Sequence, residues 1–427
     1  MEKELSPGTR VKLHTKKGDF ECTILESPSS DIILIKLDSG YNIGIREEEI
    51  LDVKVIGKKL DKEIKDKEIK SNSDLPNIAL IATGGTISSR LDYKTGGVKW
   101  LTNPNELLKF YPGLLEIANV SKIEIPFMKA SENMDSEDWE KIAECAGKLL
   151  NDSDIDGIII THGTDFLHYT ASALAFSLEN LNKPVVLTYS QRSSDRASSD
   201  ANLNLICAAR AAISNIAEVM LVGHANLNDE FCYALPATKV RKMHSSRRDT
   251  FRPINSKPIA KIWPDKIEVC RGYNQKDNKK KVKVNAHFNN KVALVKFYPG
   301  QNPDILEYYQ KQGYKGIIIE MSGLGHVITD GKNDWIPKLK KTIKSGLIIC
   351  ATLQTIYGTL DSLVYSAGRE LEKTGIIYLK DMLSETALVK LQWILGNQNL
   401  KKNVKANMLK NIANEFNNCI SEDEFLN

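Results

Sequence analysis

Two short segments of this chain combine hydroxyl groups with glycine turns, and both follow apolar runs. Residues 78–82 (IALIA) lead into residues 83–86 (TGGT), and residues 157–160 (GIII) lead into residues 161–165 (THGTD). Short apolar runs that end at turn residues predict buried strands. Glycines after a strand allow a tight turn and the close approach of a small ligand.

The hydroxyl groups of Thr86 and Thr164 therefore stand at positions where a ligand could bind, because open α/β sheets bind ligands beyond the carboxyl ends of their strands. Either segment alone is more typical of an ordinary strand-to-helix turn. Two such segments together indicate one site built from two loops, and we expect that site to carry chemistry.

The composition is that of a soluble globular protein, with 42% hydrophobic and 26% charged residues. A net charge of +4 on 58 basic and 54 acidic residues does not by itself indicate nucleic-acid binding. No apolar run reaches the ~18 residues of a transmembrane helix, and the first residues do not resemble a signal peptide. The seven cysteines lack Cys-x-x-Cys spacing. We therefore expect a cytoplasmic chain with no membrane contact, no metal site and no cofactor of its own.

Apolar runs alternate with amphipathic segments over most of the chain, which predicts α/β domains with parallel sheets and helices on both faces. Residues 8–56 differ, because short alternating segments separated by turns at roughly 10-residue spacing predict a small β-barrel. Such barrels bind RNA or protein, or dock onto their own chain. The predicted domain organisation is a barrel (1–56), a charged linker (57–74), an α/β domain (75–264), a second linker (265–290), a second α/β domain (291–400) and a helical tail (401–427).

The two threonine segments resemble the paired motifs of the L-asparaginase/glutaminase family of threonine amidohydrolases. The resemblance covers about residues 76–400 and implies two asparaginase-type α/β domains behind the barrel. It implies Thr86, Thr164, Asp165 and Lys239 as catalytic residues. It also implies substrate-binding roles for Tyr93 in a lid loop and for Ser131, Glu132 and Gly163.

The implied chemistry is amide hydrolysis, which needs a nucleophile, a base and an oxyanion stabiliser. Thr164, Asp165 and Lys239 would form a proton relay, and Thr86 would attack the side-chain amide. Thr164 remains an alternative nucleophile, and Lys242 and Arg241 are close rivals of Lys239 for the role of base. Backbone N–H groups of the Gly84 and Gly163 turns would hold the oxyanion, Ser131 would meet the substrate's α-carboxylate, and Asp165 its α-amino group.

The barrel and linker that precede the amidohydrolase part, together with residues 191–200 and 241–248, resemble the D-type subunits of archaeal glutamyl-tRNA(Gln) amidotransferases. That resemblance implies a glutaminase that passes ammonia to a partner, the E-type subunit, which binds tRNA(Gln) and uses ATP and Mg²⁺. It also implies a homodimer within a heterotetramer. Two alternatives are a stand-alone cytosolic L-asparaginase and a non-catalytic RNA-binding scaffold.

Overall fold

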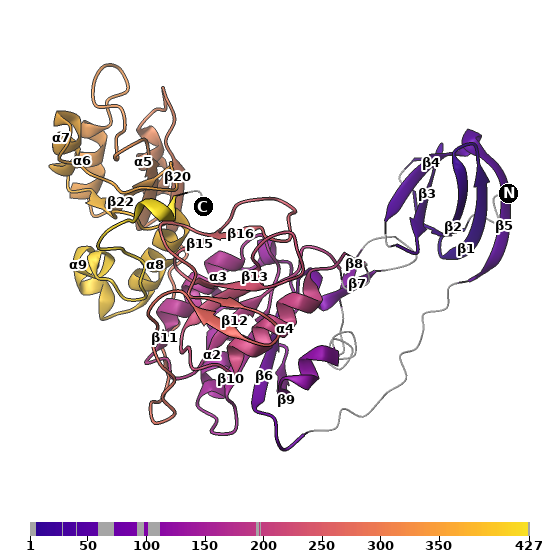
Figure 1. Ribbon diagram of the computed structural model, residues 1–427. Coiled ribbons are helices and arrows are strands. Elements are labelled where there is room, and N and C mark those ends of the chain that lie inside the picture. Colours follow the sequence, from indigo (N-terminus) through magenta and orange to yellow (C-terminus); the bar gives the residue numbers. More distant parts are fainter. Residues whose placement is uncertain are drawn as a thin grey trace.

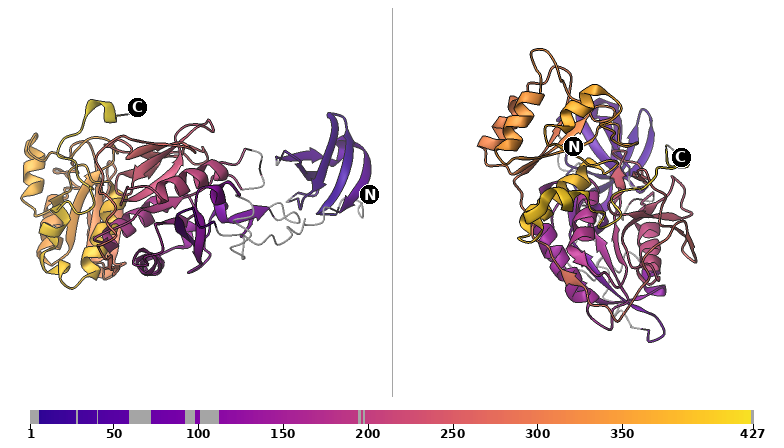
Figure 2. Two further views of the ribbon diagram at one scale, coloured as in Figure 1. Left: turned by 60° about the horizontal axis from the view of Figure 1, so that its bottom comes forward. Right: turned by 90° about the vertical axis from the view of Figure 1, so that its left-hand side faces the viewer.

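The computed structural model describes residues 6–27, 29–39, 41–58, 72–91, 98–100, 112–193, 196 and 198–425. It shows an N-terminal sheet followed by two α/β domains that lie against each other (Figures 1 and 2). Tyr93, the predicted lid residue, lies outside the described residues.

The N-terminal unit is a five-stranded antiparallel sheet with strand order β4-β3-β2-β1-β5. Along β1, side chains alternate between buried and more exposed positions. The hydrophobic core of the N-terminal sheet includes Val11, Leu13, Cys22 and Ile35. No pairing of β4 with β5 closes the sheet into a barrel within the described residues. The strands are β1 (Thr9–Thr15), β2 (Gly18–Ile24), β3 (Ile32–Leu37), β4 (Asn42–Arg46) and β5 (Ile50–Lys58), with a 3₁₀ turn at Glu47–Glu49.

The first α/β domain is built on an eight-stranded sheet with order β18-β17-β14-β13-β12-β10-β6-β9. The five strands from β13 to β9 are parallel, as predicted, whereas β14, β17 and β18 add an antiparallel edge. The strands are β6 (Asn77–Ala82), β9 (Asn119–Glu124), β10 (Gly157–Thr161), β12 (Val185–Thr188), β13 (Val219–His224), β14 (Cys232–Pro236), β17 (Ala260–Ile262) and β18 (Ile267–Val269).

Both faces of this sheet are buried, which explains why its strands read as continuous apolar runs. Along β6, Ile78 and Leu80 belong to one core cluster, and Ala79 and Ile81 belong to the other. The covering helices are α2 (Ser136–Leu150), α3 (Leu167–Ser177) and α4 (Ala201–Ala212). Smaller elements are β7 (Ser89–Leu91), β8 (Val98–Trp100), β11 (Leu178–Glu179), β15 (Val240–Lys242), β16 (Phe251–Pro253) and 3₁₀ turns at Thr86–Ser88, Pro112–Glu116 and Ser131–Asn133.

The second α/β domain contains a four-stranded parallel sheet, β20-β21-β22-β23. Its elements are β20 (Val292–Lys296), α5 (Asp304–Lys311), β21 (Gly316–Met321), α6 (Ile336–Lys344), β22 (Ile348–Leu353), α7 (Ser366–Glu372), β23 (Ile377–Tyr378) and α8 (Ser384–Gly396). A tail follows with α9 (Val404–Leu409) and 3₁₀ turns at Leu400–Asn403 and Glu422–Glu424.

Helices α3 and α8 hold the two domains together. The Phe176 and Trp393 rings stack with centroids 5.7 Å apart, and Ser172 and Thr386 share a hydrogen bond of 3.1 Å. The segment 265–290 between the domains contains β18, which pairs with β17, and β19 (Lys283–Val284), which pairs with β11. These pairings tie much of the segment to the first domain.

Candidate active site

The two threonine segments meet at the carboxyl ends of strands β6 and β10 of the first sheet. Strands β6 and β10 are parallel neighbours, and Ala82 pairs with Thr161 in register. Beyond this point the Thr83 hydroxyl donates a 2.8 Å hydrogen bond to the Thr161 carbonyl. A third segment joins them, because the Lys129 N–H donates to the Thr83 carbonyl at 2.9 Å. The prediction that one site is built from two neighbouring loops agrees with this arrangement.

Glycines allow these loops to pack backbone against backbone. Gly84 and Gly85 have φ angles of +124° and +80°, which side-chain-bearing residues rarely adopt. A Cβ on Gly84 would collide with the Lys129 carbonyl, and one on Gly85 would lie 2.5 Å from the Gly163 nitrogen. Thr86 and Thr164 are each the next residue after one of the touching glycines, so the contact brings their loops together.

Lys242 completes a cluster with the second threonine segment. Its Nζ donates to the Thr164 hydroxyl at 2.8 Å and to Asp165 Oδ1 at 2.7 Å. The Lys242 side chain is only 10% exposed, whereas that of Asp165 is 59% exposed. A hydroxyl, a carboxylate and an amine in mutual reach form the kind of set that can move a proton from a nucleophile.

The predicted contact of Lys239 with Thr164 and Asp165 is wrong. Lys239 Nζ instead donates to Asp381 Oδ2 at 2.5 Å and to the Asp381 carbonyl at 3.2 Å, and both side chains are 2% exposed. Burial lowers the pKa of Lys239, although the charge of Asp381 acts in the opposite direction.

Strand geometry explains the difference between the two lysines. Successive side chains of a strand point to opposite sides, and Lys239 is followed directly by β15. Val240 packs into the core of the first domain, and Lys242 points toward the same domain. Lys239 and Arg241 instead reach Asp381 and Glu385 of the second domain. The alternation of side chains is the sequence signal that would have favoured Lys242.

A pocket of about 420 Å³ opens beside this cluster. Arg241 and Glu385 form an ion pair of 3.1 Å in its wall. Burial raises the pKa of Glu385, and the charge of Arg241 counteracts this effect. The pocket is lined by Asp165, Phe166, His168, Tyr169, Arg241, Lys242, Met243, His244, Ser245 and Glu385.

The remaining predicted residues take different positions. Ser131 is buried, its hydroxyl accepts a hydrogen bond from the Phe166 N–H at 3.3 Å, and it lies against Gly163. Glu132, the next residue, is exposed. Ser131 therefore belongs to the packed centre of the site, and Glu132 is open to solvent at its border.

His162 lies within the second segment but is held in a neutral form. Its Nδ1–H donates to the Gly163 carbonyl at 2.7 Å, and its Nε2 accepts from the Thr170 hydroxyl at 2.9 Å. Burial lowers the pKa of His162 to about 4. Burial also lowers the pKa of His168 to about 3. Both rings are thus buried and neutral, His162 in the loop after β10 and His168 in α3, and they do not replace Lys242 as a base.

Within the described residues, no group of three or more His, Cys, Asp or Glu is arranged to hold a metal ion. No helix in the described part of the chain is long and apolar enough to span a membrane.

Comparison with known proteins agrees with the fold. The family models "Asparaginase, N-terminal" and "Glutaminase/Asparaginase C-terminal domain" match residues 77–275 and 291–408. The solved L-asparaginase of Thermococcus kodakarensis is 28% identical, with a TM-score of 0.70 over 80% of this chain and 100% of its own. L-asparaginase I of Vibrio cholerae is 27% identical, with a TM-score of 0.69 over 80% of this chain and 99% of its own. Fold and site together define an asparaginase-type α/β enzyme.

The N-terminal sheet identifies a particular family among the asparaginase-type enzymes. A third family model, "GatD N-terminal domain", matches residues 5–56. The D-type subunit of the glutamyl-tRNA(Gln) amidotransferase from Thermococcus kodakarensis is 46% identical over 99% of this chain and 97% of its own length. Its counterpart from Pyrococcus furiosus is 47% identical over 96% of this chain and 94% of its own length. The chain belongs to this GatD family, the D-type subunits of glutamyl-tRNA(Gln) amidotransferase.

Proposed function

We propose that this chain hydrolyses glutamine and supplies the ammonia to a partner protein that converts Glu-tRNA(Gln) to Gln-tRNA(Gln). The observation that carries the proposal is the contact of Lys242 with both Thr164 and Asp165, in a chain that also has the N-terminal sheet of the GatD family. A stand-alone asparaginase would account for the site but not for the match of residues 5–56.

The proposed reaction proceeds through a threonine ester. The Thr86 hydroxyl attacks the side-chain carbonyl of glutamine, its proton is transferred to the amide nitrogen, the C–N bond breaks, and ammonia leaves. Water then cleaves the ester and releases glutamate. Lys242 acts as the base in this transfer and relays the proton together with Thr164 and Asp165, both of which its Nζ contacts. Backbone N–H groups of the Gly84 and Gly163 turns would stabilise the oxyanion, because the two turns face each other in the site.

Thr164 is a second candidate for the attacking residue, and its direct contact with Lys242 favours it. The two possibilities differ in where the ester forms. We would trap the acyl-enzyme at low pH and locate the added mass by peptide mass spectrometry. Mass on the peptide of Thr86 supports the proposed assignment, and mass on the peptide of Thr164 reverses it.

Partner, ligands and assembly are also part of the proposal. The partner, the E-type subunit of the amidotransferase, would hold tRNA(Gln) and use ATP and Mg²⁺, while this chain would bind glutamine without a cofactor of its own. Two copies would form a homodimer within a heterotetramer, and the exposed Leu363, Val364 and Tyr365 are one apolar surface available for such contacts. The reaction would take place in the cytoplasm, where the seven unpaired cysteines would remain reduced.

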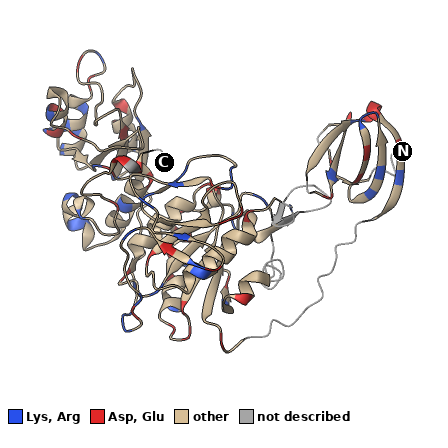
Figure 3. Cartoon of the chain, in the orientation of Figure 1, with Lys and Arg blue, Asp and Glu red and all other residues tan. Residues whose placement is uncertain are grey.

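Charges on the N-terminal sheet give little support to an RNA-binding scaffold. Arg10 pairs with Glu21 and Asp38, both at 2.8 Å, and Lys17 pairs with Glu49 at 2.9 Å. Figure 3 shows blue and red residues interspersed over this sheet and over the α/β domains. A nucleic-acid surface usually gathers basic residues on one face.

The decisive experiment separates the two half-reactions. We expect Thr86→Ala and Thr164→Ala to abolish glutamine-dependent formation of Gln-tRNA(Gln) by the complex with the partner, while the ammonia-dependent reaction continues. Thr359→Ala, at an exposed threonine far along the chain, is the matched control and should support both reactions. Loss of the ammonia-dependent reaction in the two site variants would contradict the proposed division of labour. Rapid asparagine hydrolysis by the chain alone, unchanged by partner and tRNA, would favour the stand-alone asparaginase.

A further inference from the structure

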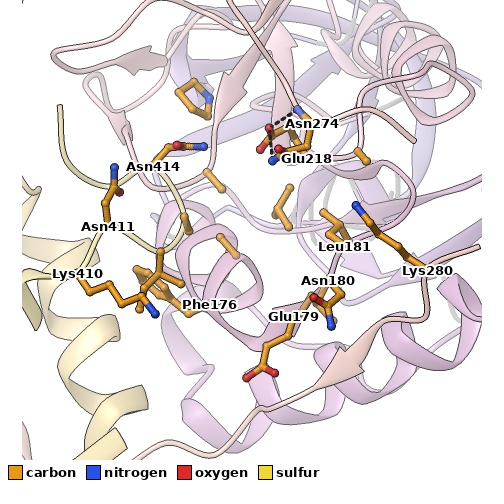
Figure 4. A pocket seen from close by; sticks show the side chains of 18 of the residues that line it. Phe176, Glu179, Asn180, Leu181, Glu218, Asn274, Lys280, Lys410, Asn411 and Asn414 are labelled. Carbon is orange, nitrogen blue, oxygen red and sulfur yellow. Dashed lines mark hydrogen bonds between the residues drawn. The ribbon is translucent and has the colours of Figure 1, made fainter. Parts of the chain in front are cut away.

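A second cavity of the described structure lies away from the candidate active site. It is an interdomain cleft of about 910 Å³. Its walls include the end of α3 and β11, the residues that precede β13, the loop from Arg271 to Lys280, and the tail turn from Asn407 to Asn414 (Figure 4). Val219, the first residue of β13, lines it, so the cleft opens at the amino ends of the parallel strands. The threonine segments lie at the opposite, carboxyl ends.

Arg271 lines this cleft and forms no ion pair with any of the described residues. Its Nε is buried and has no hydrogen-bond partner in the described structure. Glu218, whose charge acts on Arg271, does not reach ion-pair distance of it; its Oε1 accepts from the backbone N–H of Asn274 at 3.0 Å and from its side-chain amide at 2.9 Å (Figure 4). A guanidinium carries five N–H donors, and leaving buried donors unpaired is costly. Burial lowers the pKa of Arg271, whereas the charge of Glu218 acts to raise it.

Most other cations around the cleft are paired. Lys276 contacts Asp156 at 2.7 Å, and Lys280 contacts Asp277 at 3.9 Å. Lys410 differs, because no ion pair involves its ammonium group within the described residues. Its side chain lines the cleft on the side of the tail (Figure 4). Arg271 and Lys410 are therefore the two cations of the cleft lining that form no ion pair among the described residues.

The cleft also offers neutral hydrogen-bonding groups. The side chains of Asn180, Asn411 and Asn414 lie around it in Figure 4. A volume of about 910 Å³ lies within the range of small-molecule sites. Amide groups together with an unpaired guanidinium suit an oxygen-rich anion, because Arg binds carboxylate and phosphate groups through paired N–H donors.

We propose that the interdomain cleft is a binding site for a small anionic molecule, whose carboxylate or phosphate group is held by Arg271 with Lys410 contributing charge. The proposal does not depend on the glutaminase reaction, because none of these residues belongs to the active-site cluster. It has a structural link to that cluster, however. Ala237 lines the cleft, and the chain runs from it directly through Lys239 to Lys242.

The test is isothermal titration calorimetry of the full chain with inorganic phosphate and, separately, with succinate. We expect at least one of the two anions to bind with a dissociation constant below about 10 mM. Arg271→Gln should weaken that binding at least tenfold, and Lys410→Gln should weaken it less. Arg369→Gln removes the same charge from an exposed position on α7 and should leave binding unchanged.

The two anions distinguish a phosphate ligand from a carboxylate ligand. Binding of neither anion at 10 mM would overturn the proposal, and so would equal weakening by Arg271→Gln and Arg369→Gln. Thermal unfolding of each variant would be compared first. If Arg271→Gln does not fold, Arg271→Lys is used instead, and it should retain the charge but lose at least part of the affinity. Because binding is measured without substrate, failure here leaves the proposed glutaminase untouched.

Discussion

Two lysines three positions apart in the sequence serve different purposes in this molecule. Lys242 contacts the polar side chains of Thr164 and Asp165 beside an open pocket, whereas Lys239 is buried against Asp381 of the other domain. The same residue type is therefore placed for chemistry at one position and for domain attachment at the other.

Substitution of each lysine by methionine should separate these purposes. Lys242→Met removes the proposed base and should lower kcat for glutamine roughly 10²- to 10⁴-fold with little change in stability. Lys239→Met leaves the buried Asp381 carboxylate without its partner and should lower the free energy of unfolding by about 3–5 kcal/mol. Steady-state kinetics and urea unfolding of both variants provide the check. A stable Lys242→Met enzyme with normal kcat would contradict the assignment.

The buried histidine of the second threonine segment should make stability depend on pH. Because the pKa of His162 falls to about 4 in the folded chain, the unfolded chain binds a proton first as the pH drops below about 6.5. The contribution of neutral His162 is therefore complete above pH 6.5 and declines between pH 6.5 and 4, by on the order of 3 kcal/mol. Unfolding free energies measured from pH 7.5 to 4.5 should show this slope.

A histidine variant identifies the source of that slope. His162→Gln should flatten the dependence, while His287→Gln, at an exposed position, should leave it as it is. His168, whose pKa falls to about 3, will contribute a slope of the same sign. An identical slope in wild type and His162→Gln would show that His162 is not responsible.

At the scale of elements, the site depends on how closely three loops approach one another. Gly85 faces the Gly163 backbone, and Gly84 faces the Lys129 backbone. Parallel pairing of β6 and β10 sets the direction of these loops, and the glycines set their distance.

Gly85→Ala should therefore impair both folding and activity. Its Cβ would lie 2.5 Å from the Gly163 nitrogen, in a backbone conformation that alanine rarely adopts. Gly313→Ala is the matched control, because Gly313 has a φ of +80° as well but open space around it. We expect the control to lose about 1 kcal/mol of stability and keep its activity. Thermal unfolding and glutaminase rates compare the two variants. Equal effects would mean that the strained backbone conformation, rather than the close contact with Gly163, causes the loss.

Much of this arrangement could be predicted from the sequence. The apolar runs predicted the buried strands, and the glycines after two of them predicted that Thr86 and Thr164 would share a site. The antiparallel strands β14, β17 and β18 were not predicted, because short strands at a sheet edge have little periodicity of their own. The position of Lys242 depends on which domain each side of β15 faces, and that is a property of tertiary packing.

At the scale of the whole molecule, the C-terminal tail (residues 401–425) packs against helix α8, which lies between the two domains. Lys390 of α8 donates to Glu415 at 2.5 Å and to the carbonyls of Met408 and Lys410 at 2.9 and 2.6 Å. The side chains of Lys390 and Glu415 are both fully buried. The predicted helical tail is thus short in helix but firmly attached through one ion pair.

Glu415→Gln should lower the stability of the protein by disrupting this ion pair. It keeps the shape of the side chain but leaves the Lys390 ammonium buried without its counter-charge, so stability should fall by about 3–5 kcal/mol. The double variant Lys390→Met/Glu415→Gln should recover much of the loss, because no buried charge remains. Glu422→Gln, at an exposed tail position, is the control. Urea unfolding of the four proteins measures the effect, and a neutral Glu415→Gln would contradict it.

The anchors of the segment that carries Lys242 are encoded far downstream. Lys239 meets its counter-charge 142 residues later at Asp381, and the Thr238 hydroxyl donates to the Ala413 carbonyl 175 residues later. Domains made first generally fold first during synthesis. A nascent chain that ends before Asp381 would already contain Thr86 and Thr164. The segment that carries Lys242 would, however, still lack its contacts with the second domain and the tail. The order of synthesis would therefore delay glutamine hydrolysis until the polypeptide is nearly complete, and truncated products in the cell would not waste glutamine.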